Sequence, residues 1–229
     1  MRKFSLLVFA IFTSLIINAQ CNEYYVLEQG TEWMYENINP KGKLTGKMQQ
    51  TVNVFEKTAT GFNAAVTSVI YNEKGKEQTK GDLDMSCVNG TFIVDMRKFI
   101  PAEQQKMFAS YKMNITSENL ELPAKLTVGQ TLKNGSVTLT AEGSPLPMNM
   151  TVTITDRKVE SKETITTPAG TFECFKISSK SNVSTKMGVN MSFNFSGIEW
   201  IAPKVGMVKS ESFDKNGKSS GYTQLTSYK

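Results

Sequence analysis

The sequence predicts an all-β protein of mainly antiparallel strands, built as a curved sheet, a half-barrel or a sandwich, with one short helix near residues 101–112. Short runs of β-favouring residues, separated by turn residues, recur along most of the chain. Several of these runs alternate between apolar and polar side chains, as strands with one buried face do. Because consecutive runs are joined by short turns, we expect them to pair antiparallel.

The first group of predicted strands precedes residue 100. The turn sequences NPKGK (39–43) and NEKGK (72–76) separate the earlier runs. The dipeptide Asn89-Gly90 follows later, and it favours a tight hairpin because both residues accept a positive φ. The predicted strands are 31–38, 47–56, 61–71, 82–87 and 91–96.

The predicted helix comes next in the chain. Pro101 suits the first position of a helix, and Met107 and Tyr111 lie one turn apart. A helix here would cover an open face of the sheet. The strands predicted after it are 136–141, 148–156, 158–166, 172–179, 189–195, 206–213 and 221–228.

The stretch TTPAGTFECFKI (166–177) has a proline and a glycine that fit a turn, followed by a strand with unusual patterning. Phe172 and Cys174 share one face of this strand, whereas Phe175 and Ile177 share the other. A strand that is apolar on both faces is central and covered twice, or it carries a bulge that resets the alternation. We therefore interpret this stretch as architecture rather than as a catalytic site.

The N-terminus has the layout of a secretory signal peptide, residues 1–20. Two basic residues precede an apolar run from Phe4 to Ile17, which is too short for a transmembrane helix. We expect cleavage after Gln20 and a mature chain, 21–229, that forms a single β-rich domain in the periplasm or outside the cell and is not transmembrane. Lipid anchoring at Cys21 is the alternative, although lipoproteins normally carry a small residue where Gln20 stands.

The charge balance gives little support to a nucleic-acid partner. The whole chain has a formal net charge of +5, and its lysines are spread over turns where they alternate with acids. The sequence contains no long basic run and no basic–aromatic cluster. The partners that we expect instead are a lipid-like ligand or an envelope protein.

The three cysteines, Cys21, Cys87 and Cys174, allow at most one intramolecular disulfide. An exported chain tends to pair its cysteines. We expect Cys21 to pair with Cys87, because Cys174 lies in the predicted central strand, where a buried thiol behaves as a small hydrophobe. If Cys21 is lipidated, Cys87 and Cys174 form the sole remaining pair.

The composition excludes several catalytic chemistries. The chain has no histidine, which rules out Ser–His and Cys–His nucleophiles and histidine-ligated metals. CxxC, phosphate-loop and calcium motifs are also missing from the sequence, so we expect no cofactor and no metal. Asp82 with Asp84, or Glu118 with Glu121, leaves a carboxylate-based hydrolase as a third hypothesis, although a solvated strand edge also explains these pairs.

Two of the later strands carry a methionine-rich face. Met148 and Met150 point to one side of the first strand, and Met191 and Phe193 to one side of the second. Methionine fills irregular space and lines adaptable surfaces, so these four residues form a candidate cavity for a hydrophobic ligand. The alternative is an ordinary core, in which apolar stripes with the period of a strand are common.

The order of several short segments resembles the TapB-like family of exported proteins from Gram-negative envelopes. These segments span essentially the whole mature chain: CNEYY, GTEWMYE, KGKLTG, KGKEQTKG, CVNGTFIVDM, LPAKLTVGQTL, TPAGTFECFKI and WIAPKVGMVKSE. The resemblance implies a secreted β-rich domain of unknown function, and it supplies no catalytic or binding residues. We therefore expect a non-enzymatic secreted or periplasmic binding module for a hydrophobic ligand or an envelope component. The alternative is a structural or surface interaction protein that pairs through sheet edges or loops.

Overall fold

The computed structural model describes residues 23–100, 105–106, 111–144, 148–187 and 189–229, and it confirms the all-β prediction. One antiparallel sheet contains all 13 strands. In chain order they are β1 Glu32–Ile38, β2 Leu44–Thr58, β3 Gly61–Asn72, β4 Glu77–Val88, β5 Thr91–Val94, β6 Lys112–Glu118, β7 Leu120–Leu122, β8 Gly135–Glu142, β9 Met148–Thr167, β10 Gly170–Met187, β11 Val189–Ala202, β12 Gly206–Phe213 and β13 Ser219–Tyr228.

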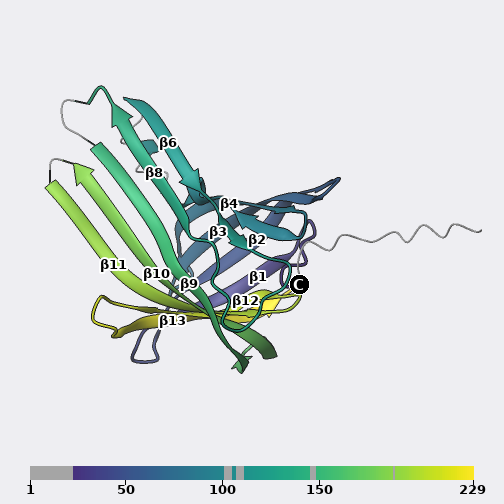
Figure 1. Cartoon of the computed structure of the whole chain (residues 1–229). Helices are drawn as coiled ribbons and strands as arrows, with labels where there is room; N and C mark the ends of the chain where they lie inside the picture. The colour runs from purple at the N-terminus through teal and green to yellow at the C-terminus, as the bar shows by residue number, and fades with distance from the viewer. Residues whose placement is uncertain (1–22, 101–104, 107–110, 145–147, 188) are drawn as a thin grey trace, which may run out of the picture.

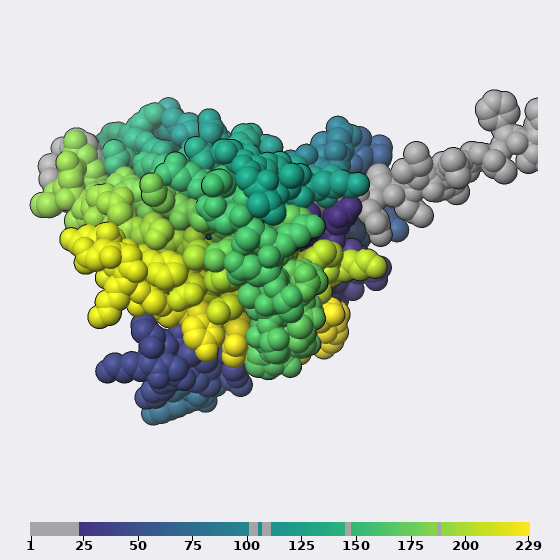
Figure 2. Space-filling view, turned by 60° about the horizontal axis from the view of Figure 1, so that its bottom comes forward, coloured from purple at the N-terminus to yellow at the C-terminus, as the bar shows by residue number. Residues whose placement is uncertain are grey.

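The sheet curls until its two edges come together. Its order is β6-β8-β9-β10-β11-β12-β13-β1-β2-β3-β4-β5-β7, so the edge strands β6 and β7 are consecutive in the chain with only Asn119 between them. The result is a nearly closed barrel from which β6 and β8 to β11 rise as a tall wall (Figure 1). The yellow C-terminal segments lie beside the purple N-terminal ones (Figure 2), as the pairing of β13 with β1 requires.

The predicted turns are formed by the residues that favour them. Asn89 and Gly90 join β4 to β5 with φ angles of 50° and 83°, the left-handed conformation that an Asn-Gly hairpin needs. The proline–glycine turn joins β9 to β10 and ends at Gly170, whose φ of 138° is open to glycine but strained for other residues. These two hairpins confirm the local turn predictions.

The strand after the proline–glycine turn is covered on both faces. Adjacent residues of β10 point to opposite faces, yet Cys174 is 1% exposed and Phe175 is 8% exposed. Phe175 meets the ring of Tyr24 edge-on, with centroids 5.8 Å apart. The interpretation of TTPAGTFECFKI as a central element is therefore confirmed.

Some element boundaries differ from the prediction. The runs 148–156 and 158–166 form one long strand, β9, whose pairing with β10 is interrupted by two bulges rather than by a turn. Strands β6 and β7 were not predicted, because β6 is mostly polar with little apolar alternation and β7 is only three residues long.

The helical segment also differs in its limits. The predicted helix over 101–112 lies mostly outside the described residues, although Gln105 and Lys106 are helical. Lys112 already belongs to β6. A 3-10 helix, Met96–Phe99, replaces the end of the predicted strand 91–96, because the side chain of Asp95 caps its start by accepting a hydrogen bond from the Arg97 backbone N–H.

Two apolar clusters fill the curled sheet. The larger one occupies the nearly closed part and includes Trp33, Tyr35, Val66, Phe175, Val208 and Leu225. The smaller one lies against the wall and includes Met96, Ile100, Val137, Leu139, Met150 and Val152. The space between these clusters is where the sheet interior changes from apolar to polar.

Candidate ligand-binding cavity

Polar residues occupy inward-facing positions on five neighbouring strands. Directly paired residues of antiparallel strands share a face of the sheet. Residues paired across several strands in this way form a row over the sheet. One row lies on the face that carries the buried core residues Tyr35, Val208 and Leu225, and a second row lies next to the first. The first row is Ile177, Glu199, Ser210, Thr223 and Asn37, and the second is Ser179, Gly197, Ser212 and Gly221. Inward positions of a sheet are usually apolar, but apart from Ile177 these positions carry small polar residues, glycine and one glutamate, which leave open space instead of a packed core.

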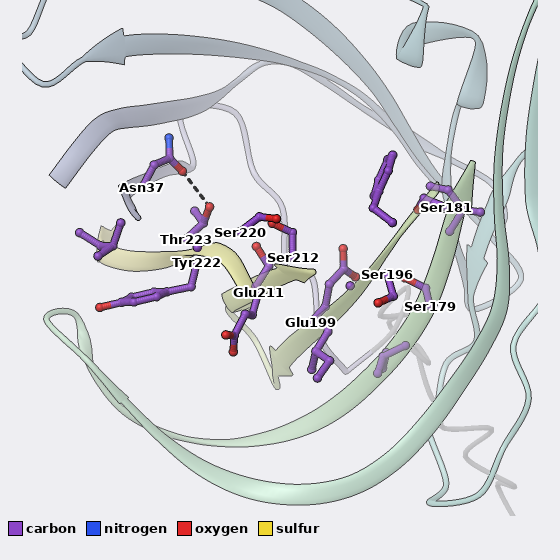
Figure 3. Close-up of a pocket in the computed structure, with 18 of the residues that line it drawn as sticks. Asn37, Ser179, Ser181, Ser196, Glu199, Glu211, Ser212, Ser220, Tyr222 and Thr223 are labelled. Atoms are coloured by element: carbon purple, nitrogen blue, oxygen red, sulfur yellow. Dashed lines mark hydrogen bonds between the residues drawn. The ribbon is translucent and has the colours of Figure 1, made fainter. Parts of the chain in front are cut away.

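These rows line a cavity of about 470 Å³. Asn37 and Thr223 lie at one side of it, and Ser179 and Ser181 lie at the other, with Glu199 between them (Figure 3). The hydroxyl of Thr223 donates a hydrogen bond of 2.7 Å to Oδ1 of Asn37. The volume falls in the range typical of sites for small molecules.

Glu199 is the acidic group of the cavity. Its carboxylate is accessible from the cavity, and it has no hydrogen bond or ion pair with any described residue. The surrounding protein limits its hydration and so raises the pKa of Glu199, while the charge of Arg157 acts in the opposite direction. Because Glu199 is exposed, its carboxylate is open to solvent and to any ligand that enters the cavity.

Arg157 reaches the same cavity because of a bulge in β9. Asp156 and Arg157 together oppose Ser179 of β10, and Asp156 has a left-handed φ of 52°. The additional residue resets the alternation, so Ile154 and Arg157 both point inward although they are three residues apart. Without the bulge, Arg157 would point to the outer face.

The guanidinium of Arg157 is only partly satisfied by protein. Its side chain is 8% exposed, and Nη1 donates to the backbone oxygens of Glu121 at 2.9 Å and Lys133 at 2.7 Å. Burial lowers the pKa of Arg157, and the nearby charge of Glu199 opposes that effect. Among the described residues, no carboxylate forms an ion pair with it. Two opposite charges therefore face one cavity without contacting each other directly.

An apolar strip leads away from the cavity. Phe195 lines the cavity, and the inward face of β11 continues from it toward the strand's start through Phe193, Met191 and Val189. All four side chains are well exposed, with Phe193 at 60% and Met191 at 50%. This apolar strip (Val189, Met191, Phe193 and Phe195) is a continuous hydrophobic surface beside a polar cavity.

The predicted methionine-rich face is placed on the wall. Met150 is buried in the smaller apolar cluster and Met148 packs against it, whereas Met191 and Phe193 belong to the exposed apolar strip. Met150 and Met191 lie on the same inner face, since both pair with Thr185. None of the four predicted residues lines the cavity around Glu199. Their role in ligand binding stays a prediction.

Sequence reasoning missed the two charged residues of the cavity. Glu199 could have been found, because it continues the alternation of Phe193 and Phe195 and so places a charge on an apolar face. Arg157 could not, since its inward direction depends on the bulge.

The other predicted residues lie away from the cavity. Cys87 takes part in a disulfide and Cys174 is a free buried thiol, but Cys21 lies outside the described residues, so its pairing with Cys87 stays a prediction. The possible lipidation of Cys21 and the signal peptide over residues 1–20 also lie outside them.

The predicted carboxylate pairs have ordinary protein partners. On β4, Asp82 accepts a hydrogen bond of 2.7 Å from Thr67, and Asp84 forms an ion pair of 3.2 Å with Lys98. In the second pair, Glu121 is bound by Lys133 at 2.6 Å, and Glu118 is exposed at the end of β6. Within the described ranges, no group of three or more acidic or cysteine side chains is arranged to hold a metal ion.

Comparisons with known proteins relate the chain to exported proteins. The family model described as DUF3108-like matches residues 28–225. A presumed exported protein with a YmcC-like fold from Bacteroides fragilis has a TM-score of 0.70 and 21% sequence identity, over 91% of this chain and 100% of that one. A presumed lipoprotein from Parabacteroides distasonis has a TM-score of 0.69 and 28% identity, over 91% and 99%. No significant match was found among curated proteins. Within the described part of the chain, no helix has the length and apolar character needed to cross a bilayer.

Proposed function

Since this chain belongs to the DUF3108-like family, whose function is unknown, we propose that it is an exported, non-catalytic binding module that holds a ligand in the cavity around Glu199. The ligand is a lipid-like molecule or another component of the cell envelope. Within the family, the segments quoted from the sequence favour the TapB-like group. The two similar solved structures, a presumed exported protein and a presumed lipoprotein, support a place in the periplasm or outside the cell.

One observation carries this proposal: the unpaired carboxylate of Glu199 inside a curled sheet. A close-packed apolar interior would have stabilised the same sheet better, since burying apolar surface is the main favourable term in folding. The polar rows and the charge instead leave the interior open as a cavity. A ligand can reach Glu199 there, because this side chain is exposed and has no hydrogen bond or ion pair with a described residue.

A catalytic role has less support from the same geometry. A glycosidase needs two carboxyl groups flanking one bond. On β11 and β12, Glu199 pairs with Ser210 while Glu211 pairs with Ile198, so the two glutamates nearest the cavity point to opposite faces of the sheet.

Filling the cavity tests the proposal. Gly197 faces the cavity, its φ is not left-handed, and the atoms nearest to an added Cβ are 3.6 Å and 3.7 Å away, so a larger side chain fits the backbone and enters the cavity. Gly81→Phe on β4 is the matched control, because an added Cβ there meets nothing within 4 Å. We would purify the mature chain without detergent from envelopes of a Gram-negative host and record native mass spectra.

The proposal expects an additional bound mass in the wild type and in Gly81→Phe, and its loss in Gly197→Phe. Total envelope lipid extract should also raise the melting temperature of the first two proteins only. No bound mass and no thermal shift in the wild type would refute the proposal. Equal binding by both variants would place the ligand elsewhere.

A surface interaction function is the second candidate, and the edge of β11 favours it. Its first half, Val189–Phe195, pairs with β10 on one side, and its pairing with β12 begins only at Ser196. An unpaired strand edge is a template for adding another strand. Asn190→Lys charges this edge without changing the apolar strip. If the wild type self-associates or captures an envelope protein and this variant does not, the second candidate is favoured.

A further inference from the structure

We infer that the ligand is a zwitterionic amphiphile: its charged head group binds between Glu199 and Arg157, and its apolar chain lies along the apolar strip of β11. This inference rests on the proposed binding function. It adds the chemical class of the ligand and the direction in which it lies.

The two charges of the cavity specify the head group. A guanidinium has five N–H donors, and the two carbonyl contacts of Arg157 use Nη1 alone, so the donors on Nε and Nη2 have no acceptor among the described residues. Neither nitrogen is sealed from solvent, since Thr185 carries the sole side-chain polar atom of the described residues that is both buried and unpaired. Since Arg157 lines the cavity, we take these donors to be available to an anionic oxygen of a ligand there.

Glu199 calls for the opposite charge. Its carboxylate accepts hydrogen bonds only, and none is donated by the described residues. An ammonium group would satisfy it with charge-assisted hydrogen bonds. The Glu199 carboxylate and the Arg157 guanidinium form no ion pair with each other. A head group that carries both an ammonium and an anionic oxyacid would bind to both of them.

The two protein charges also select against ligands of one sign. A purely anionic head group that reaches Arg157 meets the carboxylate of Glu199, and a purely cationic one meets the guanidinium. Like charges that meet in one cavity repel each other, so a head group with no net charge is preferred.

The apolar strip accounts for the rest of the molecule. Its ends, Val189 and Phe195, are six residues apart on one strand, which corresponds to about 20 Å at the usual rise of a strand. Phe195 belongs both to the strip and to the cavity, so a chain leaving the cavity can continue onto the strip without crossing a polar surface. Exposed apolar surface of this kind typically marks a binding site.

Lysophosphatidylethanolamine and lysophosphatidylglycerol with the same acyl chain are the probes. The first has an ammonium and a phosphate, and the second has the phosphate alone. We would measure the binding of each to the delipidated mature chain by titration calorimetry below the concentration at which the lipids form micelles. Free glycerophosphoethanolamine, a phosphodiester with no net charge, tests the head group without a chain, and a fatty acid tests the chain with an anionic end.

The wild type should bind lysophosphatidylethanolamine most tightly, and glycerophosphoethanolamine much more weakly. Glu199→Gln, which keeps the shape of the side chain, should weaken lysophosphatidylethanolamine about 10- to 100-fold, as expected for one lost hydrogen bond between charged groups, and should not weaken lysophosphatidylglycerol. Phe193→Ser should weaken the binding of both lipids and leave the binding of glycerophosphoethanolamine unchanged. Glu77→Gln, on the exposed start of β4, is the charge-matched control and should change nothing.

The outcomes separate the two proposals. Equal affinity for both lipids, preference for the fatty acid, or an unaffected Glu199→Gln variant overturns the zwitterionic head group. If Gly197→Phe still abolishes binding in that case, the cavity remains the site of a ligand from another class. If no probe binds and envelope extract also has no effect, both proposals fail.

Discussion

Replacing Phe175 with alanine should lower the free energy of unfolding by about 3–5 kcal/mol, the usual cost of truncating a buried phenylalanine. The side chain is 8% exposed, so nearly all of its surface is removed from water. Burying about 200 Å² at roughly 25 cal/mol per Å² gives an upper value of about 5 kcal/mol. The edge-on contact with Tyr24 is worth about 0.5–1.5 kcal/mol of its own.

Urea unfolding followed by circular dichroism measures the change directly. For a chain of this size, the expected loss corresponds to a fall in melting temperature of roughly 6–20 °C. Phe193→Ala is the matched control, because the same substitution at a side chain that is 60% exposed should cost less than about 0.5 kcal/mol. If Phe175→Ala loses less than about 1 kcal/mol, or if both variants lose the same amount, the central position of this strand is wrong.

Three further changes test other parts of the structure. Hydrogen bonds from Trp200 and Ser161, together with Lys176, lower the pKa of Glu163 from 4.5 to about 2, so its stabilising effect is present above pH 4.5 and is lost as the pH falls toward 2. Glu163→Gln should therefore lower the free energy of unfolding by about 1 kcal/mol at neutral pH, a value reduced because the side chain is partly exposed, and by almost nothing near pH 2. Urea unfolding at both pH values measures this, and an equal loss at the two would show that the charge of Glu163 is not the cause. Because Asp156 has a left-handed φ of 52°, Asp156→Gly should barely change the free energy of unfolding, whereas Asp156→Val should lower it by about 1–2 kcal/mol more. Equal melting temperatures for the two variants would show that stability does not depend on this left-handed residue of the bulge. Burial raises the pKa of the Cys174 thiol from 9.0 to about 11, so an aromatic disulfide reagent at neutral pH should label it only after denaturation; rapid labelling of the folded protein would refute its burial.

Local order was determined by the sequence alone. The strand over Val189–Phe195, the Asn89-Gly90 hairpin and the doubly apolar strand at Cys174 and Phe175 all form as predicted, although the apolar face of the first is exposed rather than buried. Each depends on a short-range rule: side chains alternate along a strand, and positive φ angles favour asparagine and glycine. Such rules act within a few residues and need no knowledge of distant parts of the chain.

Only the tertiary structure decided how the strands close and which side chains share the cavity. β6 and β7 become the two edges of one curled sheet, and no local pattern in their short sequences indicates that position. The bulge at Asp156 turns Arg157 inward, and the pairing of β9 with β10 and of β10 with β11 brings it to the same space as Glu199. The alternation of side chains shows which residues share a face of one strand. Whether that face points into or out of the curled sheet depends on which strands pair and on where a bulge shifts the alternation, and both are set by long-range contacts.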